Sequence, residues 1–557
     1  MFNGLRPFRL ALLALGLVSL ASCRICRAQN PAPAQSTAQD TTFRIAGTIV
    51  NALDGSPLGR ARVSVSETTN RPNPVSMVTS ETGRFEFAGL KAAKFSLQGA
   101  KRGFISAAYD QHEQFSTAIV TGAGFDTEHL VLRLTPMASL AGKVVDESGD
   151  PVRHARVALY REDHSAGLNR ITAAGNSSTD DLGSYEFPYL APGNYFVSAQ
   201  AKPWYAIHPA SSSPDGTPNR ASVLPSLDVS YPTTYYDGAT EGDLAVPIPL
   251  KPGDRLQIDV RLNPVPSLHI IFHVPEGQQS FGQPIFVKRV FDGERYVQSD
   301  GMRPIGPGVY ELAGIPAGKY TVRRNDPKNG QVMQSAEMEL SKDGQELEDS
   351  PVEPAGKAKL SVQLSHGEQP PKQLFVALQD SRRRIVAYQQ LGDEGIVVLE
   401  NLPAGRYTVL VSSPNKAYSV ARAVSKGTES LGHELNISPG ASIELTLFLA
   451  EGATNVEGFA KRGEKAAAGV MVILVPKDPE SHQELFRRDQ SDLDGSFALR
   501  GVIPGKYTIV AVEDAWGFPW QQPDVLARYI KHGQSVAIPE MMQGSVHLTD
   551  PVAVQPR

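Results

Sequence analysis

The stretch DGSFALRGVIPGKYTI, residues 494–509, is one of five copies of the same phrase in the chain. The other four copies begin with ETGRFEF at Glu81, DLGSYEF at Asp181, GPGVYEL at Gly306 and DEGIVVL at Asp393. A spacing kept in every copy identifies an internal repeat. In each copy a glycine precedes an aromatic residue by twelve positions: Gly83/Phe95, Gly183/Tyr195, Gly308/Tyr320, Gly395/Tyr407 and Gly495/Tyr507.

Each copy predicts two β-strands joined by a turn. After the first glycine the apolar positions alternate, as Phe497 and Leu499 do, which is the period of a strand with one buried face. The second strand opens on the aromatic residue and alternates again, as in Tyr507 and Ile509. Module 1 has Ala93 two residues before the aromatic residue, and we expect it to turn differently. The other copies have glycine there, for which we expect a positive φ: Gly193, Gly318, Gly405 and Gly505.

Matching segments flank the repeat and set the domain boundaries. Strand–turn–strand heads begin at Ile45, Leu140 and Val456, and alternating tail strands close several copies. Short strands at regular spacing with turn signals predict β-sandwiches. We therefore expect an all-β chain, a rod of five modules in line with almost no linker between them. The modules are residues 43–136 (module 1), 137–264 (module 2), 265–353 (module 3), 354–452 (module 4) and 453–557 (module 5).

Length and composition agree with several folded domains. The chain has 557 residues, and single hydrophobic cores stop growing at roughly 250–300 residues. A content of 41% hydrophobic and 20% charged residues is typical of folded protein rather than of disorder. The net charge of −5 gives no broad electrostatic footprint for nucleic acid, which excludes that class of partner.

Residues 1–28 read as a signal peptide. Arg6 and Arg9 precede a short apolar run from Leu10 to Ala21, which is too short to span a membrane. Two processing routes stay open. Residues 20–23, ending in Cys23, resemble the lipobox of bacterial lipoproteins, in which the cysteine is lipidated; alternatively, cleavage follows Ala28. We expect an exported protein: an outer-membrane or cell-surface lipoprotein that meets the membrane only through this anchor, or a periplasmic or secreted one. Residues 29–42 read as a flexible linker.

The only two cysteines, Cys23 and Cys26, lie in this leader. The body of the chain therefore has no thiol. This excludes disulfides, thiol catalysis and cysteine-based zinc sites from the modules.

The head, the turn glycine and the L-x-P-G-x-Y phrase together resemble the carboxypeptidase regulatory-like domain. The resemblance is strong in modules 1, 2 and 5 and weak at the heads of modules 3 and 4. It implies a prealbumin-like, seven-stranded Greek-key sandwich related to Cna-type B-repeats. It also implies a non-catalytic accessory or binding module.

Three other patterns invite a chemical interpretation. His273 begins a His-x-x-Glu pattern, but His269 and His273 would share one face of a strand at about 13 Å, too far for one metal ion. The run of Asp489, Asp492 and Asp494 half resembles a calcium loop and also fits ordinary turn chemistry. An isopeptide triad of Lys143, Glu186 and Asn263 aligns poorly with the pattern of the B-repeats. We expect no catalytic residue, no metal ion and no cofactor.

The candidate binding residues are aromatic. Exposed aromatic rings stack on sugar rings or on peptide prolines. The alternative is that these rings pack between modules. They follow the last strand of the repeat in modules 2 and 5: Trp204, Tyr205, Trp516, Phe518 and Trp520.

Three functions remain open from the sequence. The first is binding of a polysaccharide or a cell-envelope component through the aromatic loops. The second is a structural spacer or adhesion stalk without a small ligand, and the third is an accessory partner of a separate peptidase. Binding predicts exposed tryptophans, whereas a spacer predicts tryptophans buried at module junctions.

Overall fold

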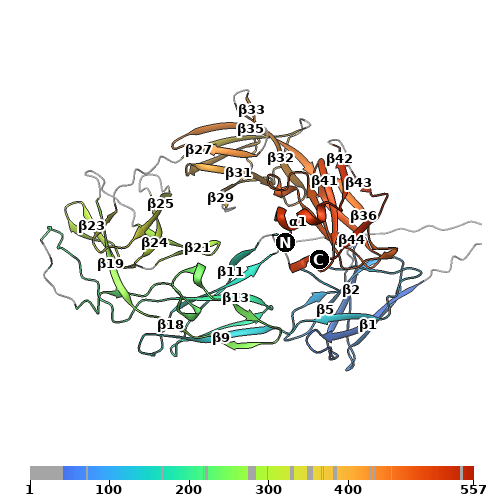
Figure 1. The fold of residues 1–557 in the computed structure, drawn as a ribbon, viewed down its shortest axis with the longest axis horizontal. Helices are drawn as coiled ribbons and strands as arrows, with labels where there is room; N and C mark the ends of the chain where they lie inside the picture. Colours follow the sequence, from blue (N-terminus) through green and yellow to red (C-terminus); the bar gives the residue numbers. More distant parts are fainter. Residues whose placement is uncertain are drawn as a thin grey trace, which may run out of the picture. The chain divides into compact units, whose positions relative to one another are not determined.

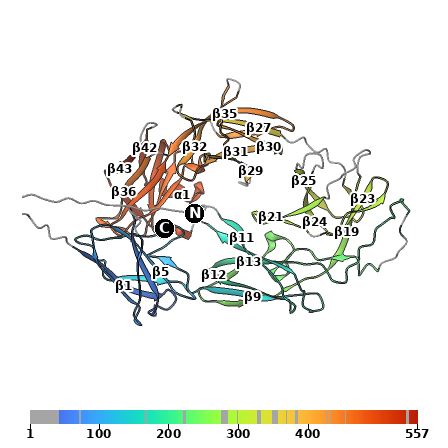
Figure 2. The ribbon, with the colours of Figure 1, turned by 180° about the vertical axis from the view of Figure 1, so that it is seen from behind.

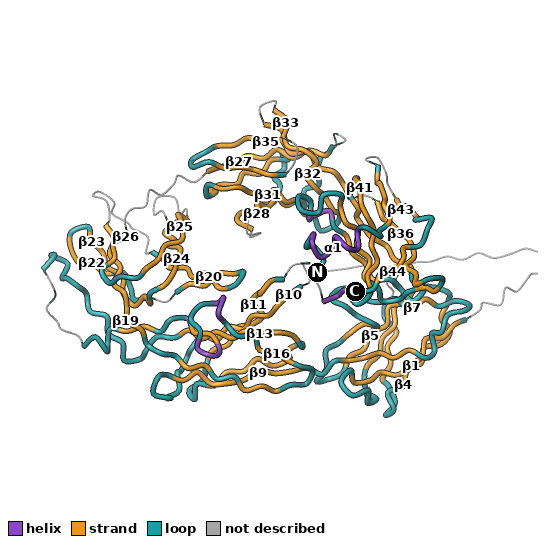
Figure 3. The backbone as a smooth tube through the Cα atoms, viewed as in Figure 1, coloured by secondary structure: helices purple, strands orange, loops and turns teal. Residues whose placement is uncertain are grey.

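A computed structural model describes most of the chain from residue 42 onward. The described residues are 42–69, 73–164, 167, 169–217, 219, 224–273, 284–297, 299–325, 332–347, 356–365, 367, 369–380, 385–425, 428–430, 433–452, 454–517, 519–539 and 544–557. Within these ranges the chain is all-β, with 44 strands against one α-helix and four short 3-10 helices. Figure 3 shows the dominance of strands. No helix in the described ranges is long and apolar enough to cross a membrane.

Module 1 shows the topology that recurs along the chain. In its first layer β1 lies between β4, which is antiparallel to it, and β8, which is parallel. In its second layer β2 pairs with β3 and β5, and β5 pairs with β7 and with the short β6, all antiparallel. The strands are β1 (Phe43–Asn51), β2 (Arg62–Glu67), β3 (Val75–Val78), β4 (Arg84–Leu90), β5 (Lys94–Ala100), β6 (Ala107–Ala108), β7 (Ile119–Val120) and β8 (Leu130–Leu134).

Modules 2 and 3 repeat this pairing. The first strand of each, β9 or β19, has an antiparallel partner from the repeat and a parallel partner from the tail. The strands of module 2 are β9 (Ala138–Val145), β10 (Arg156–Asp163), β11 (Arg170–Ser178), β12 (Ser184–Leu190), β13 (Gly193–Gln200), β14 (Val229–Ser230), β15 (Thr234–Tyr235), β16 (Ile248–Leu250), β17 (Arg255–Gln257) and β18 (Val260–Arg261), with η1 (Tyr236–Gly238) and η2 (Gly242–Leu244). Those of module 3 are β19 (Val265–His273), β20 (Ile285–Val290), β21 (Gly293–Tyr296), β22 (Arg303–Gly306), β23 (Val309–Pro316), β24 (Gly318–Asn325), β25 (Val332–Leu340) and β26 (Gln345–Leu347). The short β14 pairs with β19.

Modules 4 and 5 keep the same core pairing and add elements to it. Module 4 has β27 (Gly356–Leu364), β28 (Phe375–Asp380), β29 (Ile385–Gln390), β30 (Ile396–Leu402), β31 (Gly405–Ser412), β32 (Ala417–Ser425), β33 (Thr428–Ser430), β34 (Glu434–Ile437) and β35 (Ser442–Gly452). Module 5 has β36 (Thr454–Arg462), β37 (Lys465–Ala466), β38 (Met471–Pro476), β39 (Arg487–Gln490), β40 (Ser496–Val502), β41 (Gly505–Val512), β42 (Gln534–Ile538), β43 (Gly544–His547) and β44 (Val552–Gln555), with η3 (Gln483–Leu485), η4 (Ala515–Gly517) and α1 (Pro523–Ile530). The colours of Figures 1 and 2 follow these groups, from β1 in blue to β44 in red.

The first repeat glycine forms a tight turn that lies against the first strand of its own module. It has a φ of 69–78° in all five copies, which favours glycine. In modules 1, 2, 4 and 5 its carbonyl accepts a bond from the first strand of its own module, as Gly83 does from Ile49 and Gly495 from Ala460. A Cβ atom on Gly83 would lie 2.6 Å from the Ile49 carbonyl oxygen. The turn therefore has no room for a side chain.

In modules 4 and 5 the second repeat glycine is needed for a reason other than the expected positive φ. The expectation of a positive φ is wrong for Gly405 and Gly505, which do not adopt one. The reason for glycine there is close approach. A Cβ atom would lie 3.3–3.4 Å from the side chain of the tyrosine two residues later, in Gly318, Gly405 and Gly505 alike. The glycine makes room for that ring.

The repeat tyrosine ties its strand to the preceding turn. In modules 2 to 5 its hydroxyl donates, at 2.7 Å, to the carbonyl oxygen four residues earlier, the pairs being Tyr195–Ala191, Tyr320–Pro316, Tyr407–Pro403 and Tyr507–Ile503. Phe95 of module 1 has no hydroxyl. There the hydroxyl of Thr121 donates to the equivalent carbonyl, that of Lys91, also at 2.7 Å.

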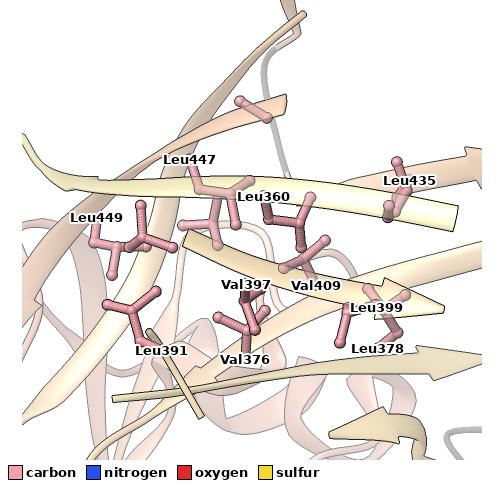
Figure 4. Close-up of a cluster of buried hydrophobic side chains, with 14 of the residues drawn as sticks. Leu360, Val376, Leu378, Leu391, Val397, Leu399, Val409, Leu435, Leu447 and Leu449 are labelled. Carbon is pink, nitrogen blue, oxygen red and sulfur yellow. The ribbon is translucent and has the colours of Figure 1, made fainter. Parts of the chain in front are cut away.

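Each module has its own hydrophobic core between its two layers. In module 4 the buried residues include Leu360 and Leu447 of one layer, which face Val376 of the other in Figure 4. Module 5 has a second cluster, in which β38 is buried on both faces. The inner face meets the sandwich core, and the outer face meets Leu526 and Tyr529 of α1. A fully buried strand of this kind reads as the continuous apolar run MVILVP.

Candidate functional site

The loop after β13 presents the most exposed tryptophan. Trp204 is 87% exposed, and its ring meets the edge of Tyr205 at 5.7 Å between centroids. Tyr205 is fixed from beneath, since its hydroxyl donates to the carboxylate of Glu147. The hydroxyl of Tyr231 donates to the same carboxylate at 2.8 Å. Trp204 is thus an exposed ring on an anchored base.

The Glu147 carboxylate is held in its charged form. Burial raises its pKa, but the hydrogen bonds from Tyr205 and Tyr231 outweigh that effect, and the pKa lies below its usual value. Burial, followed by the bond to Glu147, raises the pKa of Tyr205 to about 12. Both groups therefore keep their protonation states at neutral pH.

A small hollow lies beside this loop, between modules 2 and 3. Its lining includes Lys202, His208, Tyr231 and Lys288. The space between its walls, counting the part open to solvent, is about 540 Å³.

Trp516 packs against module 1. Its ring stacks on His112 at 4.9 Å with an interplanar angle of 9°, and it lies 5.7 Å from the ring of Phe115. Its Nε1 donates to the Gly469 carbonyl at 3.2 Å. Trp516 therefore holds a position between the first and the last module.

Trp520 is buried in the second cluster of module 5. It is only 6% exposed and meets the ring of Phe486 edge-on at 5.7 Å. The guanidinium of Arg488 lies 4.1 Å from the centre of the Trp520 ring, a cation–π contact. Phe518 and Cys23, which the sequence also singles out, lie outside the described residues.

An ion pair joins modules 1 and 5 under these rings. Arg488 donates to Glu113 at 2.7 Å, and the two side chains are 5% and 17% exposed. The Arg488 guanidinium also lies 5.2 Å from the ring of Phe115. Because the pair is withdrawn from water, it contributes to docking only while both partners are present.

A second set of polar contacts lies beside the first. Lys94 donates to Asp492 and to Ser496, both at 2.6 Å, and the Ala118 amide donates to Asp492 at 3.0 Å. The backbone also joins the two modules, because the Leu493 amide donates to the Ala118 carbonyl at 3.1 Å. These contacts connect modules at opposite ends of the sequence, which the expected rod did not include.

Asp492 of module 5 and Asp180 of module 2 occupy the same position of the repeat, but their carboxylates bond different partners. Asp180 accepts bonds from the amides of Leu182 and Ser184 and so stabilises its own turn. In module 5 the carboxylate of Asp492 is turned to Lys94 and Ala118 instead. The side chain that caps a turn in one module thus joins two modules in another.

The other two aspartates of this run also have partners within module 5. Asp489 accepts a bond from the Ala498 amide at 2.7 Å, and Asp494 accepts one from the Ser496 amide at 3.0 Å. These bonds are turn and strand chemistry rather than the ligand set of a calcium loop.

His269 and His273 share the face of β19 that points away from the core, as the sequence predicts, because Leu268, Ile270 and Phe272 alternate into the core. The two histidines differ in burial along that face. His269 is buried, 3.0 Å from Asp343, whereas the side chain of His273 is 56% exposed.

An isopeptide triad also fails on geometry. Lys143, Glu186 and Asn263 are all exposed. Such a bond needs its residues in the core.

Among the described residues, one group of side chains could hold a metal ion. His433 of module 4 and His482 and Glu484 of module 5 each place a ligand atom within 4.8 Å of the others. No sequence spacing indicates this group, because the residues come from two modules.

Family comparisons agree with the repeat. Residues 44–129 and 139–211, in modules 1 and 2, match the model of the carboxypeptidase regulatory-like domain. The resemblance inferred from the repeat is confirmed. Residues 451–533, in module 5, match a model described as the second beta sandwich domain of BOS complex subunit NOMO1-like proteins. No curated protein matches the chain.

Several solved structures also match. The TIE protein of Bacillus anthracis is 12% identical, with 74% of this chain and 76% of that chain covered and a TM-score of 0.17. The minor pilin of Streptococcus agalactiae is 12% identical over 40% of this chain and 97% of its own, with a TM-score of 0.21. A shaft pilin of Lactobacillus rhamnosus GG is 10% identical over 40% and 98%, with a TM-score of 0.18. TM-scores this low carry no argument about function.

Proposed function

We propose that the protein is a non-catalytic, exported structural protein whose last module docks on its first. Its class is the multi-module β-sandwich protein, and export rests on the leader, residues 1–28. The observation that carries the proposal is the position of two of the three tryptophans. Trp516 stacks on His112 of module 1, and Trp520 lies buried under Arg488. Trp516 thus packs between modules, and Trp520 supports from within module 5 the arginine that pairs with Glu113 of module 1.

The docking surface has the properties of a built contact. It combines stacked rings, a largely buried ion pair and backbone bonds. Asp492 is turned away from its own turn toward module 1. A chain whose ends are joined in this way resists the separation of its terminal modules, which suits a protein that bears load or holds a spacing.

Calorimetry on tryptophan variants tests this proposal. Trp520→Ala should destabilise module 5 by about 3–5 kcal/mol, because a buried ring is lost. Trp204→Ala should change stability by less than about 0.5 kcal/mol. Trp516→Phe, which keeps an aromatic ring, is the milder variant should Trp520→Ala not fold. Equal melting profiles for all three variants and the parent would refute the packing role.

A second candidate function has its own observation. The 87% exposure of Trp204 on an anchored base suits stacking on a polysaccharide or a cell-envelope component. Binding of the full chain to a panel of polysaccharides, including peptidoglycan, tests it. Trp204→Ala should abolish binding, while Tyr189→Ala, which removes another exposed ring of module 2, should not. The role of accessory to a separate peptidase, the lipid anchor at Cys23 and the final location stay predictions.

A further inference from the structure

His433, His482 and Glu484 meet where modules 4 and 5 adjoin. His433 directly precedes β34, while His482 and Glu484 lie between β38 and β39, with Glu484 inside η3. The imidazole rings of His433 and His482 are 5.2 Å apart between centroids. One ligand atom from each of the three residues lies within 4.8 Å of the other two.

The buried histidine has a nitrogen without a partner. His433 is 8% exposed, and its Nδ1 makes no hydrogen bond. A buried polar atom left unpaired costs about 1–3 kcal/mol, so its retention calls for an explanation. An ion pair between His482 and Glu484, 3.3 Å apart, would leave that nitrogen unpaired. An ion bound among the three residues through this nitrogen would use its lone pair.

Neighbouring groups hold the carboxylate and the buried histidine. The hydroxyl of Ser419, on β32, donates to Oε1 of Glu484 at 3.0 Å. The backbone carbonyl of His433 accepts a bond from the Val409 amide at 2.7 Å. Partners of this kind around a ligand set orient the ligands and strengthen metal binding.

We infer that His433, His482 and Glu484 form a site for a divalent transition-metal ion, Zn²⁺, that joins modules 4 and 5. Two imidazole nitrogens and one carboxylate oxygen are zinc ligands, whereas Ca²⁺ and Mg²⁺ prefer oxygen alone. Zinc bonds of about 2.0–2.2 Å require the three ligand atoms to close by about 1 Å on binding. The fourth position is left for water.

Zinc titration by calorimetry tests the site. The protein is the full chain with Cys23→Ser and Cys26→Ser, since those two thiols could bind zinc themselves. We expect one Zn²⁺ per chain at pH 7.5. His433→Ala, His482→Ala and Glu484→Gln should each weaken binding at least tenfold. His547→Ala, which removes an exposed histidine of module 5, should leave it unchanged.

Two further readouts separate a built site from adventitious binding. Co²⁺ in place of Zn²⁺ should give the visible bands of a four-coordinate nitrogen–oxygen site, and Glu484→Gln should abolish them with an unchanged circular dichroism spectrum. Zinc binding should weaken toward pH 5, because the histidines must be neutral to bind. The inference is overturned if zinc does not saturate a single site, or if Glu484→Gln binds zinc as tightly as the parent, or if binding falls equally with His547→Ala.

Discussion

One hydrogen bond recurs at the same place in every module. In four modules the tyrosine hydroxyl donates it, and in module 1 the hydroxyl of Thr121 does. The sequence shows the aromatic position clearly, but not what the hydroxyl does. Nor does it show that Thr121 supplies the hydroxyl in module 1, because Thr121 lies outside the repeat, directly after β7. The carbonyl before the turn needs a donor, and either residue type supplies one.

Removing the hydroxyl should destabilise a module measurably. Tyr195→Phe leaves the Ala191 carbonyl without its donor and should cost about 1 kcal/mol. Hydrogen exchange along β13 measures the loss. Tyr189→Phe, an exposed tyrosine of the same module, is the control and should have no effect. Equal protection in both variants would contradict the account.

Module 1 offers the complementary substitution. Thr121→Val removes the hydroxyl that bonds Lys91 and should cost at least as much, because the same hydroxyl accepts a bond from the Ala93 amide. Adding Phe95→Tyr should recover part of that loss, since the new hydroxyl would stand where tyrosine stands in the other modules. Hydrogen exchange along β5 would show the recovery, and its failure would mean that the two solutions are not equivalent.

At the scale of elements, β39 and the turn after it make the contact with module 1. Arg488 and Gln490 of β39 and Asp492 of the turn all bond residues of module 1. In module 2 the aligned part of β11 bonds module 3 instead, because Arg295 donates to Asn176 at 3.1 Å. The bonds from β39 to module 1 are therefore particular to module 5. The helix α1 is likewise a feature of module 5, and its eight residues gave no helical signal strong enough to be predicted.

Breaking the buried ion pair should weaken docking. Glu113→Gln leaves Arg488 charged and buried against the Trp520 ring, which should cost about 3 kcal/mol. Faster hydrogen exchange in both the segment near residues 110–121 and β39 would report the loss. Glu81→Gln is the matched control, because its partner Arg60 and Glu81 itself are each 80% exposed. An effect confined to module 1 would argue against the contact.

The stability of module 5 should depend on pH through the protonation of Asp489. Burial raises the pKa of Asp489 to about 6, from its usual 3.8. The folded state therefore holds a proton between about pH 4 and 6 that the unfolded state has released, and stability falls as pH rises through this window. Asp489→Asn should stabilise module 5 by about 2–3 kcal/mol at pH 7.5, with the difference vanishing near pH 4. Urea unfolding at both pH values would test this, and a gain that persists at pH 4 would contradict it.

At the scale of the whole molecule, the sequence predicts those features that depend on residues close together in the chain. The turn glycine and the alternating strands act within a few residues, so the all-β tandem fold follows from them. The contact between modules 1 and 5 joins ordinary residues such as Lys94 and Asp492, which lie 398 positions apart. Nothing in their local sequence marks them, and the same holds for His433 with His482. Trp516 and Trp520 could be recognised as candidates, but only the structure shows what they pack against.

Zero-length cross-linking tests the docking of the last module on the first most directly. A carbodiimide joins a lysine to a carboxylate that it already contacts, and Lys94 lies 2.6 Å from Asp492. We predict a Lys94–Asp492 isopeptide in the dilute, monomeric full chain, identified by mass spectrometry. It should appear together with Lys357–Glu400, a 2.7 Å pair within module 4 that serves as the positive control. Recovery of Lys357–Glu400 without Lys94–Asp492 would contradict the docking of module 5 on module 1.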